Sequence, residues 1–271
     1  MHRLTAFVLI VLLLATTAAA CVPVTPPAAP AAPEAAPAKP LIMGTESTFP
    51  PYEFRNEQNE IVGFDVDLAN AIAQKLGREL KIEDMAFDAL IPALLAGKID
   101  MIVAGMTITE ERKKKVAFSD PYYETGLVWV VRADDDRIQT ADDLKGKTLS
   151  TQTGTTSDIQ ASKIEGVNMK RFQQFTDAFL EVAAGRADAC IVNEPTAIDY
   201  VMKHPELKIG GKLQFEGTDR QFNGIAVRLE DTQLLADINK ALQALKDSGE
   251  YDKMVEKWFG AIRQQQQQQQ Q

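Results

Sequence analysis

The chain has 271 residues, with 29 Lys and Arg against 38 Asp and Glu, which gives a formal net charge of −9. This acidic balance argues against a nucleic-acid partner. Two cysteines and two histidines are too few for a disulfide framework or a histidine-rich metal site, so we expect neither a metal nor a cofactor.

Residues 1–20 have the features of a secretory signal peptide. They combine a basic start, an apolar run from Phe7 to Leu14 and three alanines directly before Cys21. This apolar run is too short to span a membrane. The placement of Cys21 resembles a bacterial lipobox, so we expect this cysteine to be lipidated after cleavage and to anchor the protein to the membrane surface. Plain secretion is the alternative.

The segments next to the two ends have biased composition. Residues 21–40 hold the anchor cysteine and a linker, and the stretch 22–40 contains seven prolines. Such a sequence forms an extended spacer and no core. Residues 264–271 are all glutamine, and we expect a disordered tail. About 220 residues remain between these segments, enough for one large domain or two smaller lobes.

Apolar runs alternate with helical patterns along this central region. Phe64–Leu76 has acidic residues in its first turn, an apolar stripe and Gly77 as its stop, which predicts a helix. Such alternation is typical of parallel α/β sheets. The predicted strands are Leu41–Thr45, Met101–Gly105, Gly126–Arg132, Thr148–Gln152, Ala189–Asn193 and Asn223–Val227.

One internal repeat suggests where a site lies. The stretches FDALIPALLAGKIDMIVAG (87–105) and FTDAFLEVAAGRADACIVN (175–193) align at a spacing of 88 residues. If two similar lobes contain them, Gly105 and Asn193 occupy equivalent strand ends and face each other across a cleft. Ligands of open α/β sheets bind at such ends. Ordinary reuse of the α/β unit is the alternative.

Arg112 follows a strand end at the expected start of a helix. A guanidinium pairs with a carboxylate in two-point geometry. Thr107 and Glu110 have the spacing of a capping box. The stretch TQTGTTSD (151–158) is a second candidate anion cradle, at a helix start. The alternatives are a solvated basic face for Arg112 and an ordinary capped helix for 151–158.

The chain from Leu41 to Gly260 resembles the bacterial solute-binding proteins that deliver polar amino acids to ABC importers. The quoted marks are GTESTFPPYEF, VGFDVDLANAIAQKLG, FDALIPALLAGKIDMIVAGMTITEERKKKVAFSDPYY, DLKGKTLSTQTGTT, AGRADACIVNEP and GEYDKMVEKWFG. The resemblance implies a two-lobed, type II periplasmic-binding-protein-like α/β fold, with two open sheets joined by a two-strand hinge. Lobe 1 would comprise 41–123 plus 223–263, and lobe 2 would comprise 124–222.

The same resemblance implies a ligand site. The position of Arg112 binds the ligand α-carboxylate in that family. Gly105 and Thr107 contact the ligand backbone, and Thr156 closes on the carboxylate from lobe 2. Phe49 and Phe87 match walls around the ligand side chain, and Glu46 matches an acidic position that meets a polar or cationic side chain.

Asn193 departs from the family pattern, since relatives usually carry Asp there to pair with the α-ammonium. Arg112 and Glu46 then sum to zero charge, which favours a neutral, glutamine-like ligand over a basic amino acid. Gln152 stands where glutamine-binding relatives carry Lys. A basic amino acid is the alternative ligand.

We therefore expect an extracytoplasmic, lipid-anchored monomer that captures an amino acid by hinge closure and delivers it to a permease and ATPase complex. The alternatives are a sensor subunit and, from another class, a dehydratase on the same fold. We expect no enzyme, because no Ser-His-Asp spacing is present and both histidines lie outside the candidate site.

Overall fold

The computed structural model describes residues 39–214 and 221–269. The predicted signal peptide, Cys21 and nearly all of the Pro/Ala linker lie outside these residues. Within the described part, no helix combines the length and apolar character needed to cross a membrane.

The first lobe is built on a five-stranded sheet. Its order is β5 (Leu80–Asp84), β1 (Leu41–Thr45), β6 (Met101–Ile102), β15 (Ala226–Val227) and β7 (Ala117–Phe118). Strand β1 runs parallel to β5 and β6, whereas β15 returns antiparallel from the C-terminal part of the chain. The helices of this lobe are α1 (Phe64–Lys75), α2 (Phe87–Leu95), α3 (Glu110–Lys113), α7 (Thr232–Asp247) and α8 (Glu250–Gln269). A small antiparallel sheet joins β2 (Thr48–Phe49), β3 (Glu53–Arg55) and β4 (Ile61–Val62).

The second lobe has its own five-stranded sheet. The order is β11 (Asn168–Phe172), β10 (Thr148–Gln152), β12 (Ala189–Asn193), β9 (Leu127–Arg132) and β13 (Leu207–Leu213). Its helices are the 3₁₀ turn η1 (Ala141–Leu144), α4 (Thr156–Ala161), α5 (Phe175–Ala183) and α6 (Glu194–Lys203).

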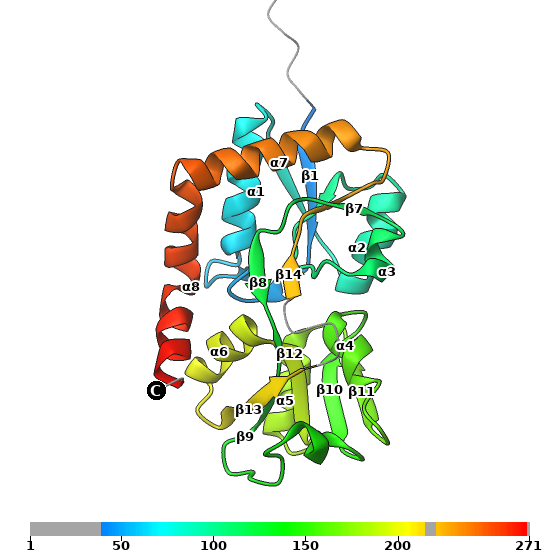
Figure 1. Cartoon of the computed structure of the whole chain (residues 1–271), viewed down its shortest axis with the longest axis vertical. Helices are drawn as coiled ribbons and strands as arrows, with labels where there is room; N and C mark the ends of the chain where they lie inside the picture. Colours follow the sequence, from blue (N-terminus) through cyan, green and yellow to red (C-terminus); the bar gives the residue numbers. More distant parts are fainter. Residues whose placement is uncertain (1–38, 215–220, 270–271) are drawn as a thin grey trace, which may run out of the picture. The chain divides into compact units, whose positions relative to one another are not determined.

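Two short strands connect the lobes. β8 (Tyr123–Thr125) pairs antiparallel with β14 (Gln221–Asn223), and Figure 1 shows both running between the two sheets. The predicted α/β fold, with two sheet-containing lobes and a two-strand hinge, is confirmed.

The internal repeat corresponds to equivalent units. α2 and α5 begin 88 residues apart, and each is followed by a glycine with positive φ, 69° at Gly97 and 68° at Gly185. Glycine stops a helix at such a position without steric cost. The strand after each helix leads toward the space between the lobes, where β6 is followed by Gly105 and β12 ends at Asn193.

Three sequence predictions need correction. The strand expected over 101–105 is only Met101–Ile102, and the one over 223–227 divides into β14 and β15 around Gly224 and Ile225. The first bends because Gly105 takes a φ of 51°, which ends an extended segment. The tail expected to be disordered is helical through Gln269, because glutamine is a good helix former and α8 needs no new nucleus to continue.

Candidate ligand-binding site

A single pocket brings together all nine site residues expected from the sequence. The ends of β1, β10 and β12 contribute to it, as open α/β sheets predict for a ligand site. Its lining comprises Glu46, Phe49, Glu53, Phe87, Ala104, Gly105, Thr107, Arg112, Gln152, Thr155, Thr156, Phe175 and Asn193.

Arg112 is a buried cation directed into this pocket. Its side chain is 7% exposed, and burial lowers its pKa to about 10. Its Nη1 donates to the carbonyl of Thr107 at 2.7 Å and its Nη2 donates to the carbonyl of Gly154 in the other lobe at 3.2 Å. Its guanidinium carbon lies 5.2 Å from the ring centroid of Phe87. Within the described residues no carboxylate forms an ion pair with it, so it has capacity for an anion.

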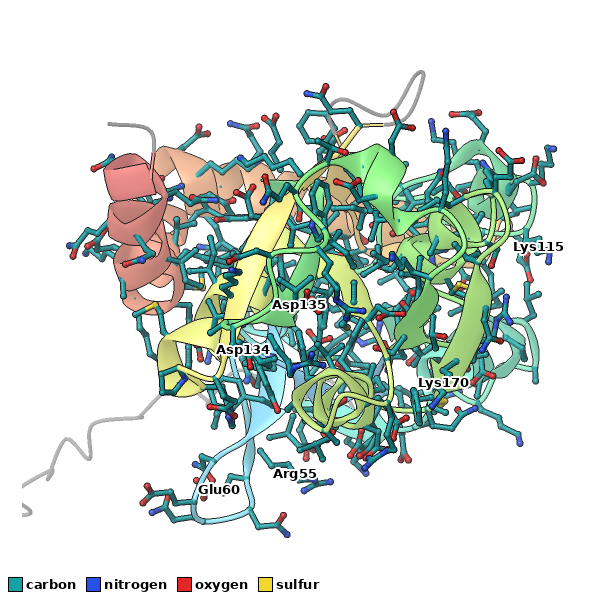
Figure 2. The ribbon with its side chains drawn as sticks, turned by 90° about the horizontal axis from the view of Figure 1, so that it is seen from below. Arg55, Glu60, Lys115, Asp134, Asp135 and Lys170 are labelled. Atoms are coloured by element: carbon teal, nitrogen blue, oxygen red, sulfur yellow. The ribbon has the colours of Figure 1, made fainter. Side chains whose placement is uncertain are left out.

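The solvated-face alternative for Arg112 is therefore wrong. Lys113, Lys114 and Lys115 are exposed, and Lys115 lies at the rim of the molecule in Figure 2. Lys113 and Lys114 pair with acidic residues of their own helix. The four-residue basic run thus contains one inward residue and three outward ones.

The expected capping box is also corrected. Helix α3 begins at Glu110 with Thr109 as its N-cap, and the Thr109 hydroxyl accepts from the backbone N–H of Arg112 at 3.2 Å. Thr107 is left to face lobe 2, where its hydroxyl lies 3.4 Å from that of Thr156. Both threonines are at least 95% buried.

Glu46 and Gln152 form a third contact between the lobes. The Gln152 side-chain amide donates to Glu46 Oε2 at 2.8 Å, and the Thr48 hydroxyl donates to the same carboxylate. Burial raises the pKa of Glu46, while these hydrogen bonds oppose that rise. The carboxylate therefore lies at the pocket with two neutral donors, and no basic residue in the described part of the chain forms an ion pair with it.

Aromatic rings line the pocket from both lobes. Phe49 stacks on Tyr52 and on Phe175, each at 5.2 Å between centroids. A Cβ at Gly105 would lie 2.7 Å from the Phe49 ring, so only glycine fits at that strand end. Phe175 was not among the site residues expected from the sequence. The internal repeat indicates it, since Phe175 is the counterpart of Phe87 at the spacing of 88 residues.

Asn193 ends β12 and is 4% exposed. Its side-chain amide donates to the Thr125 hydroxyl at 3.3 Å, which leaves its Oδ1 as the acceptor. It has no charge, as the departure from the family pattern indicated.

Glu53 is the residue that most changes the expected site. It lies on β3, is completely buried and lines the pocket, yet the charge count made from the sequence did not include it. Neighbouring Asp65, also completely buried, accepts from the backbone N–H of Gly105 at 2.7 Å. The expected neutral sum of Arg112 and Glu46 left out this pair of carboxyls. Burial raises the pKa of Glu53 well above its usual range and that of Asp65 only to about 6, so the two together add one negative charge at neutral pH.

The family model of the bacterial extracellular solute-binding proteins, family 3, matches residues 41–261. The ABC transporter arginine-binding protein 1 of Escherichia coli (strain K12) is 37% identical over 228 residues, covering 82% of this chain and 91% of that protein.

Solved structures of amino acid-binding proteins are also similar to this chain in sequence and fold. Holo ArgBP from T. maritima has 56% sequence identity and a TM-score of 0.73, covering 81% of this chain and 95% of that one. An ancestral amino acid-binding protein, AncCDT-1, described as a precursor of cyclohexadienyl dehydratase, has 38% identity and a TM-score of 0.75, with coverages of 81% and 95%. The chain therefore belongs to the bacterial extracellular solute-binding proteins, family 3, and is an amino acid-binding protein of the ABC transporter type.

Proposed function

We propose that the chain captures arginine, or a closely similar cationic amino acid, and presents it to an ABC permease. One observation carries the choice of ligand. Among the described residues of the pocket lining, Arg112 is the only basic one, whereas Glu46 and Glu53 are both acidic and Asp65 lies next to Glu53. Charge balance thus favours a ligand that brings one anion and two cations.

The charges are separated within the pocket. Burial alone accounts for the lowered pKa of Arg112, so no carboxylate compensates it closely. Glu53 has acidic neighbours, since Asp65 and Glu46 both raise its pKa. An amino acid with its carboxylate on Arg112 and a cationic side chain toward Glu46 matches this arrangement.

This proposal replaces the glutamine-like ligand expected from the sequence. That expectation depended on a pocket of zero charge, and Glu53 removes its basis. The relatives support the replacement, since the Escherichia coli protein is named as arginine-binding and a structure of ArgBP from T. maritima is described as its arginine-bound form.

The flat faces of the walls suit an arginine side chain. A guanidinium stacks on aromatic rings as well as pairing with carboxylates. We propose that Phe49 and Phe87 hold the side chain between them while Thr107 and Thr156 close over the carboxylate. Residues of both lobes contribute, so ligand binding stabilises the closed arrangement.

The direct test identifies the ligand without assuming it. Ligand released by denaturing the purified protein is identified by mass spectrometry, and the twenty amino acids are then ranked by thermal shift and titration calorimetry. We expect arginine to rank first and citrulline, the neutral counterpart with the same side-chain length, to bind at least tenfold more weakly. A neutral amino acid that binds more tightly than arginine would refute the proposed ligand.

We also propose lipid anchoring through Cys21. The Cys21→Ser variant should move from the membrane fraction to the soluble fraction with unchanged arginine affinity. If wild-type protein is found only as a soluble, unlipidated species, the anchor is refuted. Catalysis is not proposed, and prolonged incubation with arginine should leave the amino acid intact when assayed by mass spectrometry.

A further inference from the structure

Glu53 has the burial of a core residue and the chemistry of a binding residue. It is 0% exposed. Among the described residues, no backbone N–H, hydroxyl, amide or basic group donates a hydrogen bond to either of its carboxyl oxygens. A buried carboxyl with unfilled acceptors is costly unless it serves a purpose. Glu53 is also one of the residues that line the pocket, so its carboxyl lies next to the ligand site.

Asp65 ties Glu53 to one particular end of the pocket. Asp65 Oδ2 accepts from the Gly105 N–H at 2.7 Å and from the Tyr122 hydroxyl at 2.7 Å. No backbone N–H, hydroxyl, amide or basic group of the described residues donates to its Oδ1. The neighbouring Asp65 carboxyl raises the pKa of Glu53, so this pair of carboxyls holds a proton. Glu53 is thus next to the carboxyl that accepts from the Gly105 N–H, three residues after the end of β6 in lobe 1.

That end is where the ligand backbone would lie. Arg112 bonds to the carbonyl of Thr107, two residues after Gly105, so the carboxylate site is adjacent. The α-ammonium is attached to the carbon that carries the carboxylate, and therefore cannot lie far from it. The Gly105 carbonyl already accepts from the Asn223 side chain, and Asn193 offers an amide oxygen without charge.

We propose that Glu53 is the anionic partner of the ligand's α-ammonium, in place of the carboxylate that Asn193 lacks. The inference rests on the proposed amino acid ligand but applies to any amino acid, because all of them carry this group. The α-ammonium would displace the proton shared with Asp65, so binding releases a proton to solvent.

The surroundings of Glu53 support this exchange. They are acidic or neutral, and no described basic group faces it. The titratable groups around it are Asp65 on α1, Glu46 after β1, Asp84 at the end of β5, and the phenols Tyr52 and Tyr122. Like charges and burial both raise the pKa of Glu53. A cation is the one neighbour that would reverse this effect.

The test combines one conservative variant with two ligands. Glu53→Gln keeps the shape, and its amide can donate to the open Oδ1 of Asp65, so the variant should fold and melt at or above the wild-type temperature. Glu57→Gln removes the same charge from the exposed part of the same hairpin and is the matched control. Arginine and citrulline share the α-ammonium but differ in side-chain charge.

We expect Glu53→Gln to lower the affinities for arginine and citrulline by a similar factor, about 30-fold or more, because the substitution removes one partner of a desolvated ion pair. Glu57→Gln should change neither affinity. Proton release, measured by calorimetry in buffers of different ionisation enthalpy, should disappear in Glu53→Gln. Asn193→Asp added to Glu53→Gln should restore affinity to within tenfold of wild type.

Several outcomes would overturn the inference. Weakening of arginine alone would assign Glu53 to the side-chain cation, and less than threefold weakening of both ligands would make it a structural residue. Failure of Asn193→Asp to restore binding would show that the two positions do not serve one cation. If wild type prefers another amino acid, the proposed ligand fails, and the same comparison is made with that amino acid.

Discussion

Replacing Arg112 by methionine removes the cation while keeping the length of its apolar stem. Burial lowers the Arg112 pKa to about 10, and the difference from 12.5 corresponds to roughly 3 kcal/mol of desolvation that the variant would recover. The variant loses two hydrogen bonds from a charged donor, at about 1.5–3 kcal/mol each. The two effects oppose each other, so we expect the free energy of unfolding to fall by no more than about 3 kcal/mol.

Ligand binding should respond far more strongly than stability. With no carboxylate of the described residues paired to Arg112, the ligand would be its charge partner, and losing one side of such a pair costs about 2–5 kcal/mol. That corresponds to roughly 30- to 4000-fold in affinity. Titration calorimetry with arginine measures it, and Lys113→Met, an exposed change on the same helix, is the control. A loss below tenfold, or equal losses in both variants, would refute the carboxylate-binding role.

Three further predictions follow from the pocket. Phe87→Ala should weaken the binding of arginine by about 1 kcal/mol or more, because the Phe87 ring lies beside the Arg112 guanidinium and lines the pocket. Wild-type affinity for arginine in this variant would show that the ring does not contact the ligand. Gly105→Ala should weaken binding and lower the melting temperature, since the new methyl group meets the Phe49 ring at 2.7 Å and φ is 51°; a crystal structure with an unmoved ring would contradict it. Arginine affinity should rise with pH from 5.5 to 8.5, by at most about tenfold per pH unit for one proton. Burial raises the pKa of Glu53 well above its usual range and that of Asp65 to about 6, so free protein holds a proton that bound protein releases. A flat profile for wild type would exclude the proton exchange.

The fold was predictable because its signals are local and repeated. Leu41–Thr45, Thr148–Gln152 and Ala189–Asn193 form strands over the expected residues. The helix expected over 64–76 differs by one residue, as α1 ends at Lys75. Alternating apolar runs and helix stops depend on neighbouring residues, so a sequence alone carries them. The divided strand around Gly224 and the helical glutamine tract depend on packing and on helix continuation, which periodicity does not encode.

The candidate site was predictable where residue type and position together imply chemistry. Arg112 and the threonines beyond the strand ends were identified in this way, and the structure brings them into one pocket. Glu53 was missed because a glutamate between two aromatics on a short hairpin strand reads as a surface residue. Only the three-dimensional packing of β3 against α1 turns it inward, with Tyr52 and Asp65 around it.

The hydrogen bonds between the lobes also affect how long a ligand stays bound. Arg112 to Gly154, Thr107 to Thr156 and Glu46 to Gln152 each join residues of opposite lobes at the pocket. A ligand held beneath them can leave only after they separate, so its residence time is tied to the lifetime of the closed arrangement. Each bond that persists around a bound ligand adds about 0.5–1.5 kcal/mol, a factor of roughly two to ten in that lifetime. Substitutions such as Thr156→Val should therefore shorten residence time mainly through the dissociation rate, giving the permease a faster release without a change in which amino acid is chosen.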